Sequence, residues 1–177
     1  SAVFTVDNVN DPPVVANLID QAVLEGENFV EINLDDFVDD LDNTDEEMTW
    51  AVQGNVDLQV NIDTNRVATV MPPDSNWFGS EMLIFTATDP EGLSDADTAM
   101  FTITNINDAP DIIAISDQEI DEGAEFAPIS LDDAVDDPDD ADDQLIWTYS
   151  GNDTLNVSID ENRIVTISVS NEEWSGS

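Results

Sequence analysis

The sequence predicts an all-β protein built from tandem β-sandwiches, and three observations support that prediction. Short runs of alternating apolar and polar residues recur along the chain, which is the pattern of half-buried strands. Turns rich in Asp, Asn, Pro or Gly separate these runs, and no window of about 11 to 18 residues keeps a helical period. The whole pattern then returns after about 97 residues, close to the size of one sandwich domain.

Each predicted strand is a period-two run bounded by acidic residues or by Pro and Gly. In chain order, the strands expected in one repeat are 14–16 with 22–24, 29–34, 48–53, 58–62, 66–70, 82–88 and 98–105. The segment Asp63-Thr64-Asn65 is a predicted hairpin turn, because Asp and Asn tolerate the left-handed backbone and hydrogen-bond to their own turns.

Two tryptophans per repeat are candidates for the core or for a binding surface. Trp50 and Trp147 lie in the middle of predicted strands, so we expect them to pack between the sheets. Trp77 and Trp174 lie in loops and are followed by small residues. Either they close the end of the core, which we favour, or they form a platform on which a sugar ring stacks.

The repeat frame divides the chain into three parts. The correspondence needs no gaps and includes Glu25 with Glu122, Trp50 with Trp147, and Arg66 with Arg163. Residues 1–10 match the last strand of a preceding repeat, residues 11–107 form one complete repeat, and residues 108–177 form a second repeat that lacks its last two strands. The missing strands would expose core and strand edges, and we hypothesise that the N-terminal strand of a neighbouring molecule partly fills the gap.

The charge balance is extreme, with 42 acidic residues, 2 basic residues and a formal net charge of -40. Like charges at this density oppose a compact state unless cations or salt neutralise them, so a bound cation is implied. The apolar fraction of 41% argues against disorder. The two cations, Arg66 and Arg163, follow equivalent turns, and we expect each to form one buried or bidentate carboxylate pair.

Composition also excludes several classes of function. The acidity excludes nucleic acid and anionic membrane surfaces as partners, and no apolar stretch of about 18 residues predicts membrane insertion. With no His, Cys or Lys, only carboxylate chemistry is left, so the sequence predicts no enzyme. The N-terminus lacks the features of a signal peptide, so a secreted protein would contain this chain as an internal piece.

The acidic residues gather in turns, where several oxygen ligands can surround one ion. Calcium takes six to eight oxygens, which calls for clustered carboxylates, amides and carbonyls. The clusters are the junction 7–13, repeated as 105–110; Glu25-Gly26 with Glu122-Gly123; the loop 35–42, repeated as 132–139; and the loop 87–94. This recurrence favours calcium ligands over merely hydrated surface acids, the alternative that we keep for Asp45, Glu46, Glu47, Glu172 and Glu173.

In combination, these motifs resemble those of bacterial cadherin-like repeats of the dystroglycan and RTX-adhesin types. The junction Asn107-Asp108-Ala109-Pro110 is similar to the cadherin linker, Asp40-x-Asp42 to its Asp-x-Asp loop, and Ala87-x-Asp89 to the motif near its last hairpin. The resemblance covers the whole chain. It implies tandem immunoglobulin-like, Greek-key β-sandwiches, the second of them truncated.

The same resemblance implies sets of calcium ligands. At the upper end of the first repeat they are Asn8, Asn10, Asp11, Asp40, Asp42 and Asp89. At the internal junction they are Glu25, Asn105, Asn107, Asp108, Asp137 and Asp139. Glu122 corresponds to Glu25 in the second repeat.

From these sites we expect calcium at the junctions to stiffen the array of repeats, by binding only the ordered arrangement. The chain would then belong to a large secreted or cell-surface protein and act in adhesion or as an extender. Two alternatives stay open: calcium-dependent recognition of polysaccharide or of like repeats on another cell, and a spacer attached to a secreted enzyme. The partners expected are calcium and the neighbouring repeats.

Overall fold

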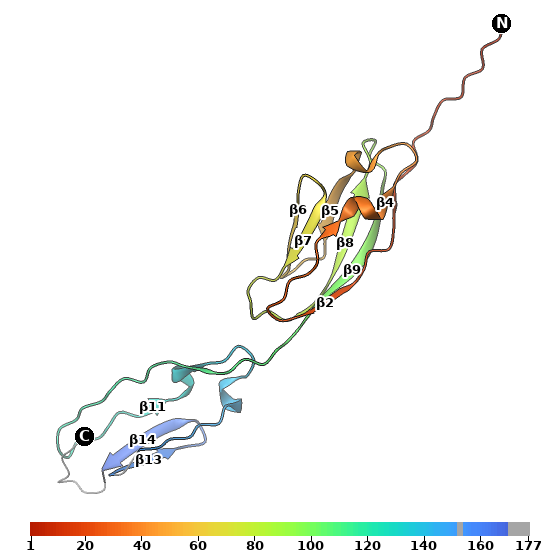
Figure 1. The fold of residues 1–177 in the computed structure, drawn as a ribbon. Helices are drawn as coiled ribbons and strands as arrows, with labels where there is room; N and C mark the ends of the chain where they lie inside the picture. The colour runs from red at the N-terminus through yellow and green to blue at the C-terminus, as the bar shows by residue number, and fades with distance from the viewer. Residues whose placement is uncertain (152–153, 170–177) are drawn as a thin grey trace. The chain divides into compact units, whose positions relative to one another are not determined.

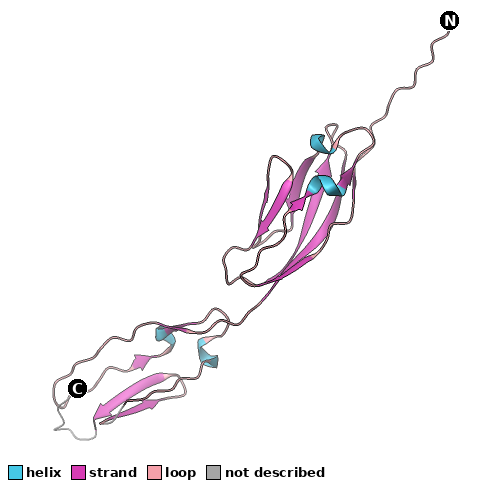
Figure 2. Cartoon of the chain, viewed as in Figure 1, coloured by secondary structure: helices cyan, strands magenta, loops and turns pink. Residues whose placement is uncertain are grey.

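The structure is a computed structural model that describes residues 1–151 and 154–169 (Figure 1). The described part is all-β, with strands, loops and four short 3-10 turns (Figure 2). The chain divides into two compact units, Ser1–Ile106 and Asn107–Ser177. Within the described residues, no helix has the length and apolarity needed to cross a membrane.

The first unit is a sandwich of two sheets. One sheet has the strand order β2-β9-β8-β5, with β2 at Gln21–Leu24, β9 at Ser94–Thr104, β8 at Gly79–Thr88 and β5 at Thr49–Gln53. The other has the order β3-β7-β6, with β3 at Ile32–Asn33, β7 at Val67–Met71 and β6 at Gln59–Ile62. The strand β2 pairs with β9 in parallel, whereas the remaining pairs in these sheets are antiparallel. The predicted sandwich fold is therefore confirmed.

The core lies between these sheets and follows from the alternation of side chains along each strand. Leu83 and Phe85 of β8 and Phe101 of β9 have no exposed surface. The ring of Phe101 meets that of Phe29 edge to face, with centroids 5.1 Å apart. Trp50 is half-buried against both apolar clusters of this unit, as predicted for a core tryptophan.

One predicted strand of the first unit is much shorter in the structure. The strand expected over 29–34 shortens to β3, because the chain turns at Leu34 into a 3-10 turn over Leu34–Phe37. That turn buries Leu34 completely and packs Phe37 against the core, so apolar side chains there serve a turn rather than a strand. A two-stranded sheet follows, in which β4 at Val38–Asp39 pairs with β1 at Val14–Val15.

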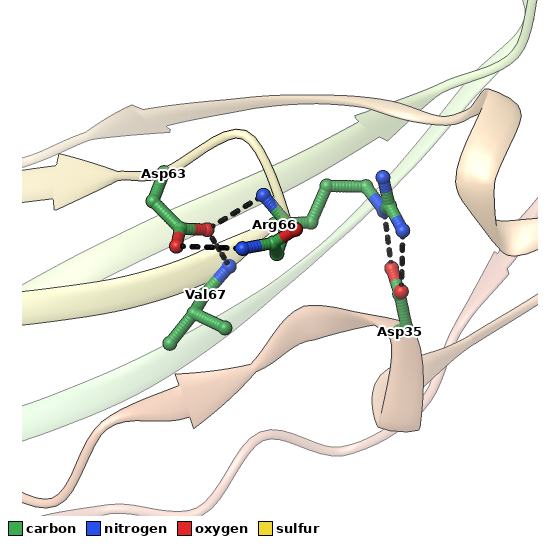
Figure 3. Close-up of polar contacts among 5 residues, drawn as sticks. Asp35, Asp63, Arg66 and Val67 are labelled. Carbon is green, nitrogen blue, oxygen red and sulfur yellow. Dashed lines mark hydrogen bonds and ion pairs between the residues drawn. The ribbon is translucent and has the colours of Figure 1, made fainter.

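The hairpin between β6 and β7 forms as predicted, but its left-handed residue is different. Arg66, not Asp63 or Asn65, has the positive φ, at 60°. A turn followed by one left-handed residue suits the twist of a hairpin, and here an arginine occupies the position that glycine favours. Its guanidinium Nε and Nη2 donate to Asp35 at 2.5 and 2.7 Å, which confirms the predicted bidentate pair (Figure 3).

The second unit repeats these features. Arg163 has the same φ of 60° and donates to Asp132 at 2.5 and 2.8 Å. One sheet has the order β11-β14-β13, and a second pairs β10 with β12. The bounds are β10 at Asp111–Ile112, β11 at Ile129–Ser130, β12 at Val135–Asp136, β13 at Leu155–Ile159 and β14 at Ile164–Val169.

Two described segments of the second unit are not strands, although the equivalent segments of the first unit are. Residues 118–121 and 146–150, which correspond to β2 and β5, are such segments. In the first unit β2 pairs with β9 and β5 with β8, and the described part of the second unit has no equivalent of β8 or β9. A strand without a ladder partner leaves its backbone groups unpaired, which explains why these segments remain irregular.

Candidate metal-binding loops

Three separate segments of the first unit meet at one end of the sandwich. Because β1 and β4 are antiparallel, the residues just before β1 lie beside the residues just after β4. Asp89 follows the end of β8 and contacts the segment before β1 through Asn10. The structure thereby brings together the six residues expected in the first-repeat site: Asn8, Asn10, Asp11, Asp40, Asp42 and Asp89.

Asparagine amides and a backbone amide hold two of the carboxylates. Asn8 Nδ2 donates to Asp42 Oδ1 at 2.8 Å, and the backbone N–H of Asp11 donates to Asp42 Oδ2 at 2.7 Å. Asn10 Nδ2 donates to Asp89 Oδ2 at 2.7 Å. The segment 8–11 therefore bridges the two acidic loops through hydrogen bonds.

These donors also favour the charged form of both carboxylates. The backbone N–H of Asp11 and the amide of Asn8 hold the pKa of Asp42 below its ordinary value. Asp89 is only 4% exposed, and burial by itself would raise its pKa. Hydrogen bonds from Asn10 and from the backbone of its own loop outweigh burial and lower it. Two neighbouring carboxylates that repel each other are thus both ionised at neutral pH.

Asp40 offers an oxygen that no protein group satisfies. Its Oδ1 accepts the backbone N–H groups of Asp42 and Asn43 at 2.8 and 2.9 Å. Its Oδ2 is buried and has no hydrogen-bond partner, and the same is true of Oδ1 of Asn43. Asn43 was missed by sequence analysis, although its place directly after Asp-x-Asp is a signal for it. Buried acceptors normally have partners, so these oxygens call for a cation or an equivalent donor.

The second unit builds the same loop independently. The backbone N–H of Asp108 donates to Asp139 Oδ2 at 2.5 Å, as Asp11 does to Asp42 in the first unit. Asp137 Oδ1 accepts from the backbone N–H groups of Asp139 and Asp140, each at 2.9 Å. Asp137 Oδ2 and Asp139 Oδ1 are buried without a partner. The loop geometry therefore belongs to the repeat and not to one local context.

The residues present fit a hard cation that prefers oxygen ligands. The unpartnered atoms are carboxylate and amide oxygens, the ligand type of calcium, and the two arginines are already paired with Asp35 and Asp132. In the described residues, however, no three acidic side chains already converge as a preformed metal site. Each loop is thus an incomplete set of ligands whose carboxylates are oriented by the backbone.

The remaining predicted ligands have other surroundings. Glu25 Oε2 accepts the backbone N–H of Ile106 at 3.0 Å, and Asn107 Nδ2 donates to the carbonyl of Asp108 at 2.6 Å. Asn105 and Glu122 are exposed. The carboxylate of Glu25 therefore holds the end of the first unit, which is a structural contact that the motif alone did not indicate.

Of the two loop tryptophans considered as a ligand platform, the structure describes Trp77 alone. Trp77 is half-buried and packs against the core, and its ring lies close to the backbone of Gly79. Gly79 has a φ of 152°, and a Cβ there would meet the Trp77 ring at 3.1 Å. Trp174 lies outside the described residues.

A family model for the bacterial Ig domain matches residues 10–104. Among solved structures, PcdhgB3 EC1-4 is similar with a TM-score of 0.55 at 19% identity, over 93% of this chain and 42% of that one. The extracellular cadherin domains 1-4 of protocadherin gamma B7 give a TM-score of 0.47 at 19% identity, over 89% of this chain and 41% of that one. This chain thus spans less than half of either. No curated protein sequence matches it.

Proposed function

The chain belongs to the bacterial Ig domain family, and from that premise we propose that it is a calcium-binding stretch of tandem repeats in a large secreted or cell-surface protein, acting in adhesion or as an extender. The family is of the immunoglobulin type and not a catalytic one. The similarity of fold to PcdhgB3 EC1-4 agrees with a cadherin-like repeat. The extracellular location is part of this proposal, because oxygen-rich calcium sites of this kind are typical of extracellular modules.

One observation carries the proposal: both units leave the same carboxylate oxygen buried and unpartnered. Asp40 Oδ2 and Asp137 Oδ2 occupy equivalent positions in two separately folded units. In each case the other oxygen of that carboxylate is fixed by two backbone N–H groups. A coincidental defect would not recur in both repeats, so a shared ligand is the better explanation.

The role of the residues follows from their contacts. Asn8, Asn10 and Asp11 tie Asp42 and Asp89 into one group, and Asp40 adds an oxygen from the same loop. Bound calcium would supply the positive charge that a chain of net charge -40 lacks. Because calcium would bind only the ordered loops, it would stabilise each repeat by linkage.

Stiffening of the array is the part of this function that depends on the repeat order. Asp108 begins the second repeat and donates its backbone N–H to Asp139, whose own N–H binds Asp137. Glu25 holds the end of the first unit at Ile106. Ordering these residues with calcium would reduce the freedom of the connection between repeats. An array of such repeats would then present a distant domain or adhesive tip.

The experiment is calcium titration by isothermal calorimetry, with variants matched in charge. In Asp40→Asn and Asp137→Asn the side-chain oxygen can still accept the backbone N–H groups, but the unpartnered oxygen becomes an NH2 group. We expect each variant to weaken or abolish binding at its own repeat. Glu46→Gln removes one exposed charge elsewhere and should titrate as the wild type does. The proposal is wrong if the wild type binds no calcium up to about 10 mM, or if all three variants behave alike.

A further inference from the structure

The chain has 2 basic residues beside 42 acidic ones, and both occupy the same place in the repeat. In the described part of the chain, Arg66 and Arg163 are the residues other than glycine that have a positive φ, each at 60°. A left-handed backbone is unfavourable for a residue with a side chain, and such positions often belong to functional sites. Each repeat therefore keeps an arginine in spite of its backbone, and the contacts of that arginine indicate what it does.

Arg66 binds the 3-10 turn Leu34–Phe37 at two points. Its backbone carbonyl accepts the N–H of Leu34 at 3.1 Å. Its guanidinium reaches from the β6–β7 hairpin to Asp35 of the turn, to whose two oxygens it donates at 2.5 and 2.7 Å (Figure 3). The N–H of Arg66 donates to the carbonyl of Asp63 at 3.0 Å, which fixes the arginine within the hairpin. We call these two contacts of one arginine with the turn the arginine clamp.

The second unit has the same arginine clamp. The carbonyl of Arg163 accepts the N–H of Leu131 at 3.1 Å, and its guanidinium donates to Asp132 at 2.5 and 2.8 Å. Asp132 begins the 3-10 turn Asp132–Ala134. Two separately folded units thus keep both contacts, although a hairpin turn by itself does not call for arginine.

The clamped turn is the start of the segment that carries the expected calcium ligands. Directly after it come the strand β4 and then Asp40. A ladder of two residues joins β4 to β1, and so short a pairing is weak by itself. The position of Asp40 therefore depends on how firmly the preceding turn is held.

The far end of each acidic loop also lies near the arginine. In the second unit the loop ends at the 3-10 turn Asp142–Gln144. The pKa of Arg163 is raised mainly by its hydrogen bonds to Asp132, and the charges of Asp143 and Asp142 add to the rise. The first unit has the same order of causes, with acids from its own 3-10 turn. One cation thus lies near both ends of each loop.

We propose that each arginine is a positioning residue for the calcium site of its repeat: it holds the base of the acidic loop so that Asp40 or Asp137 keeps one oxygen free for the ion. This inference rests on the proposed calcium function. The arginine is not a ligand, because a guanidinium has donors and no acceptor. Its positive charge opposes a second cation nearby, so charge alone gives no reason to keep it there. A fixed loop is what the arginine gives to the site.

Position and charge predict opposite effects when the arginine is replaced. Arg66→Lys keeps the positive charge but cannot bind both oxygens of Asp35 as a planar fork does. Arg66→Gly removes the charge as well, and glycine suits the left-handed backbone, so the hairpin is retained. If the arginine acts by position, both variants weaken calcium binding at the first repeat. If it acts by charge, the first variant has no effect and the second tightens binding.

The test is a calcium titration of the whole chain followed by NMR. The backbone N–H of Asp42 reports on the first repeat and that of Asp139 on the second, because these groups donate to the carboxylates that keep a free oxygen, at 2.8 and 2.9 Å. We expect both Arg66 variants to raise the calcium Kd at the first repeat by about 10- to 100-fold, as loss of a contact that orients a ligand does, and to leave the second repeat unchanged. Arg163→Lys should do the reverse, so each repeat is the control for the other.

A measurement without calcium separates this inference from the proposed function. In EDTA, both Arg66 variants should speed hydrogen exchange of the Asp42 N–H more than that of N–H groups in β8, and circular dichroism shows that the variants remain folded. If the wild type binds calcium, an affinity that both variants leave unchanged or tighten overturns this inference and not the proposed function. If the wild type binds no calcium, the proposed function is wrong, and unchanged exchange at Asp42 then overturns the arginine clamp as well.

Discussion

Asp63 shows what a single carboxylate does in this fold. It accepts the backbone N–H groups of Asn65 and Val67 at 2.8 and 2.9 Å, and the bond from Val67 contributes most to lowering its pKa (Figure 3). The pKa of Asp132 is lowered mainly by the hydrogen bonds from Arg163. Both contacts are strongest with an ionised carboxylate, so folding and ionisation are coupled at these residues.

This coupling predicts the behaviour of the chain in acid. A carboxyl group whose pKa is lower in the folded state adds stability that is fully present above its unfolded pKa of about 3.9. That stability is lost as the pH falls through the folded pKa. We therefore expect the contribution of these contacts to the free energy of unfolding to decrease below about pH 4, separately from the relief of carboxylate repulsion as the acids are protonated. The urea midpoint in EDTA at constant ionic strength, from about pH 7 to pH 3, measures the decrease.

Asp63→Asn is the matched variant for this prediction. The asparagine oxygen can still accept the N–H groups of Asn65 and Val67, but the side chain no longer titrates. The midpoint of this variant should fall less steeply in acid than that of the wild type. Equal slopes for the two proteins would show that Asp63 does not couple folding to pH.

At the scale of single residues, the sequence predicted the type of contact that a side chain makes better than the residue that it contacts. It predicted a bidentate carboxylate pair for Arg66, because an arginine in an acidic chain favours a fork-shaped contact. It did not identify Asp35, because that partner comes from a 3-10 turn whose position depends on how the core packs. The left-handed backbone at Arg66 was likewise not predicted, since a hairpin loop normally places glycine or asparagine there.

At the scale of elements, the segment between β1 and β2 shows how strands are joined without a ladder. β1 belongs to the small sheet with β4, and β2 pairs with β9. Between them, the N–H of Leu18 donates to Asp97 Oδ2 at 2.7 Å. In return, Asp20 Oδ1 accepts the N–H of Met100 at 2.8 Å. Side-chain carboxylates thus replace backbone acceptors where the chain crosses from one sheet to the other.

Removing one of these acceptors should be costly. Leu18 is only 2% exposed, so Asp97→Ala leaves its N–H buried without an acceptor. We expect a loss of about 1–3 kcal/mol in the free energy of unfolding. Asp97→Asn keeps an oxygen at that place and should be close to the wild type. Urea unfolding of both variants measures the difference, and equal stability of the two would mean that the N–H finds another partner.

This crossing also explains why the predicted strand bounds were only partly right. The strand expected over 98–105 begins earlier, at Ser94. Asp95 and Asp97 look like loop residues in the sequence, so the prediction left them out of the strand. In the structure they lie within β9 and accept N–H groups of segment 15–18. The strand expected over 29–34 is shorter, because Leu34 is buried by a turn. Alternation predicts which residues are buried more reliably than which backbone groups pair.

At the scale of the whole molecule, charge is separated from the sheets. The acidic residues gather in loops that leave carboxylate oxygens without partners, whereas the four-stranded sheet turns its own three carboxylates inward. The recurrence of acidic motifs predicted where the loops lie. It could not show that Asp40 and Asp137 each keep one oxygen buried and unpartnered, because that depends on how the backbone N–H groups two and three residues further on fold back onto the other oxygen.

The net charge of -40 predicts a stability that depends strongly on ions. In EDTA, carboxylates in neighbouring loops repel one another, and raising NaCl from about 0.01 to 0.5 M shortens the screening length from about 30 Å to a few ångströms. We expect the melting temperature to rise by several degrees over that range. If calcium binds these loops as proposed, saturating calcium should neutralise them locally, and the same change in salt should then have a smaller effect. Scanning calorimetry in NaCl and in choline chloride distinguishes general screening from specific sodium binding. Both salts screen charges equally, whereas only NaCl supplies sodium. A melting temperature that is independent of salt in EDTA would mean that the loop charges do not oppose folding, and calcium would then have no repulsion to relieve.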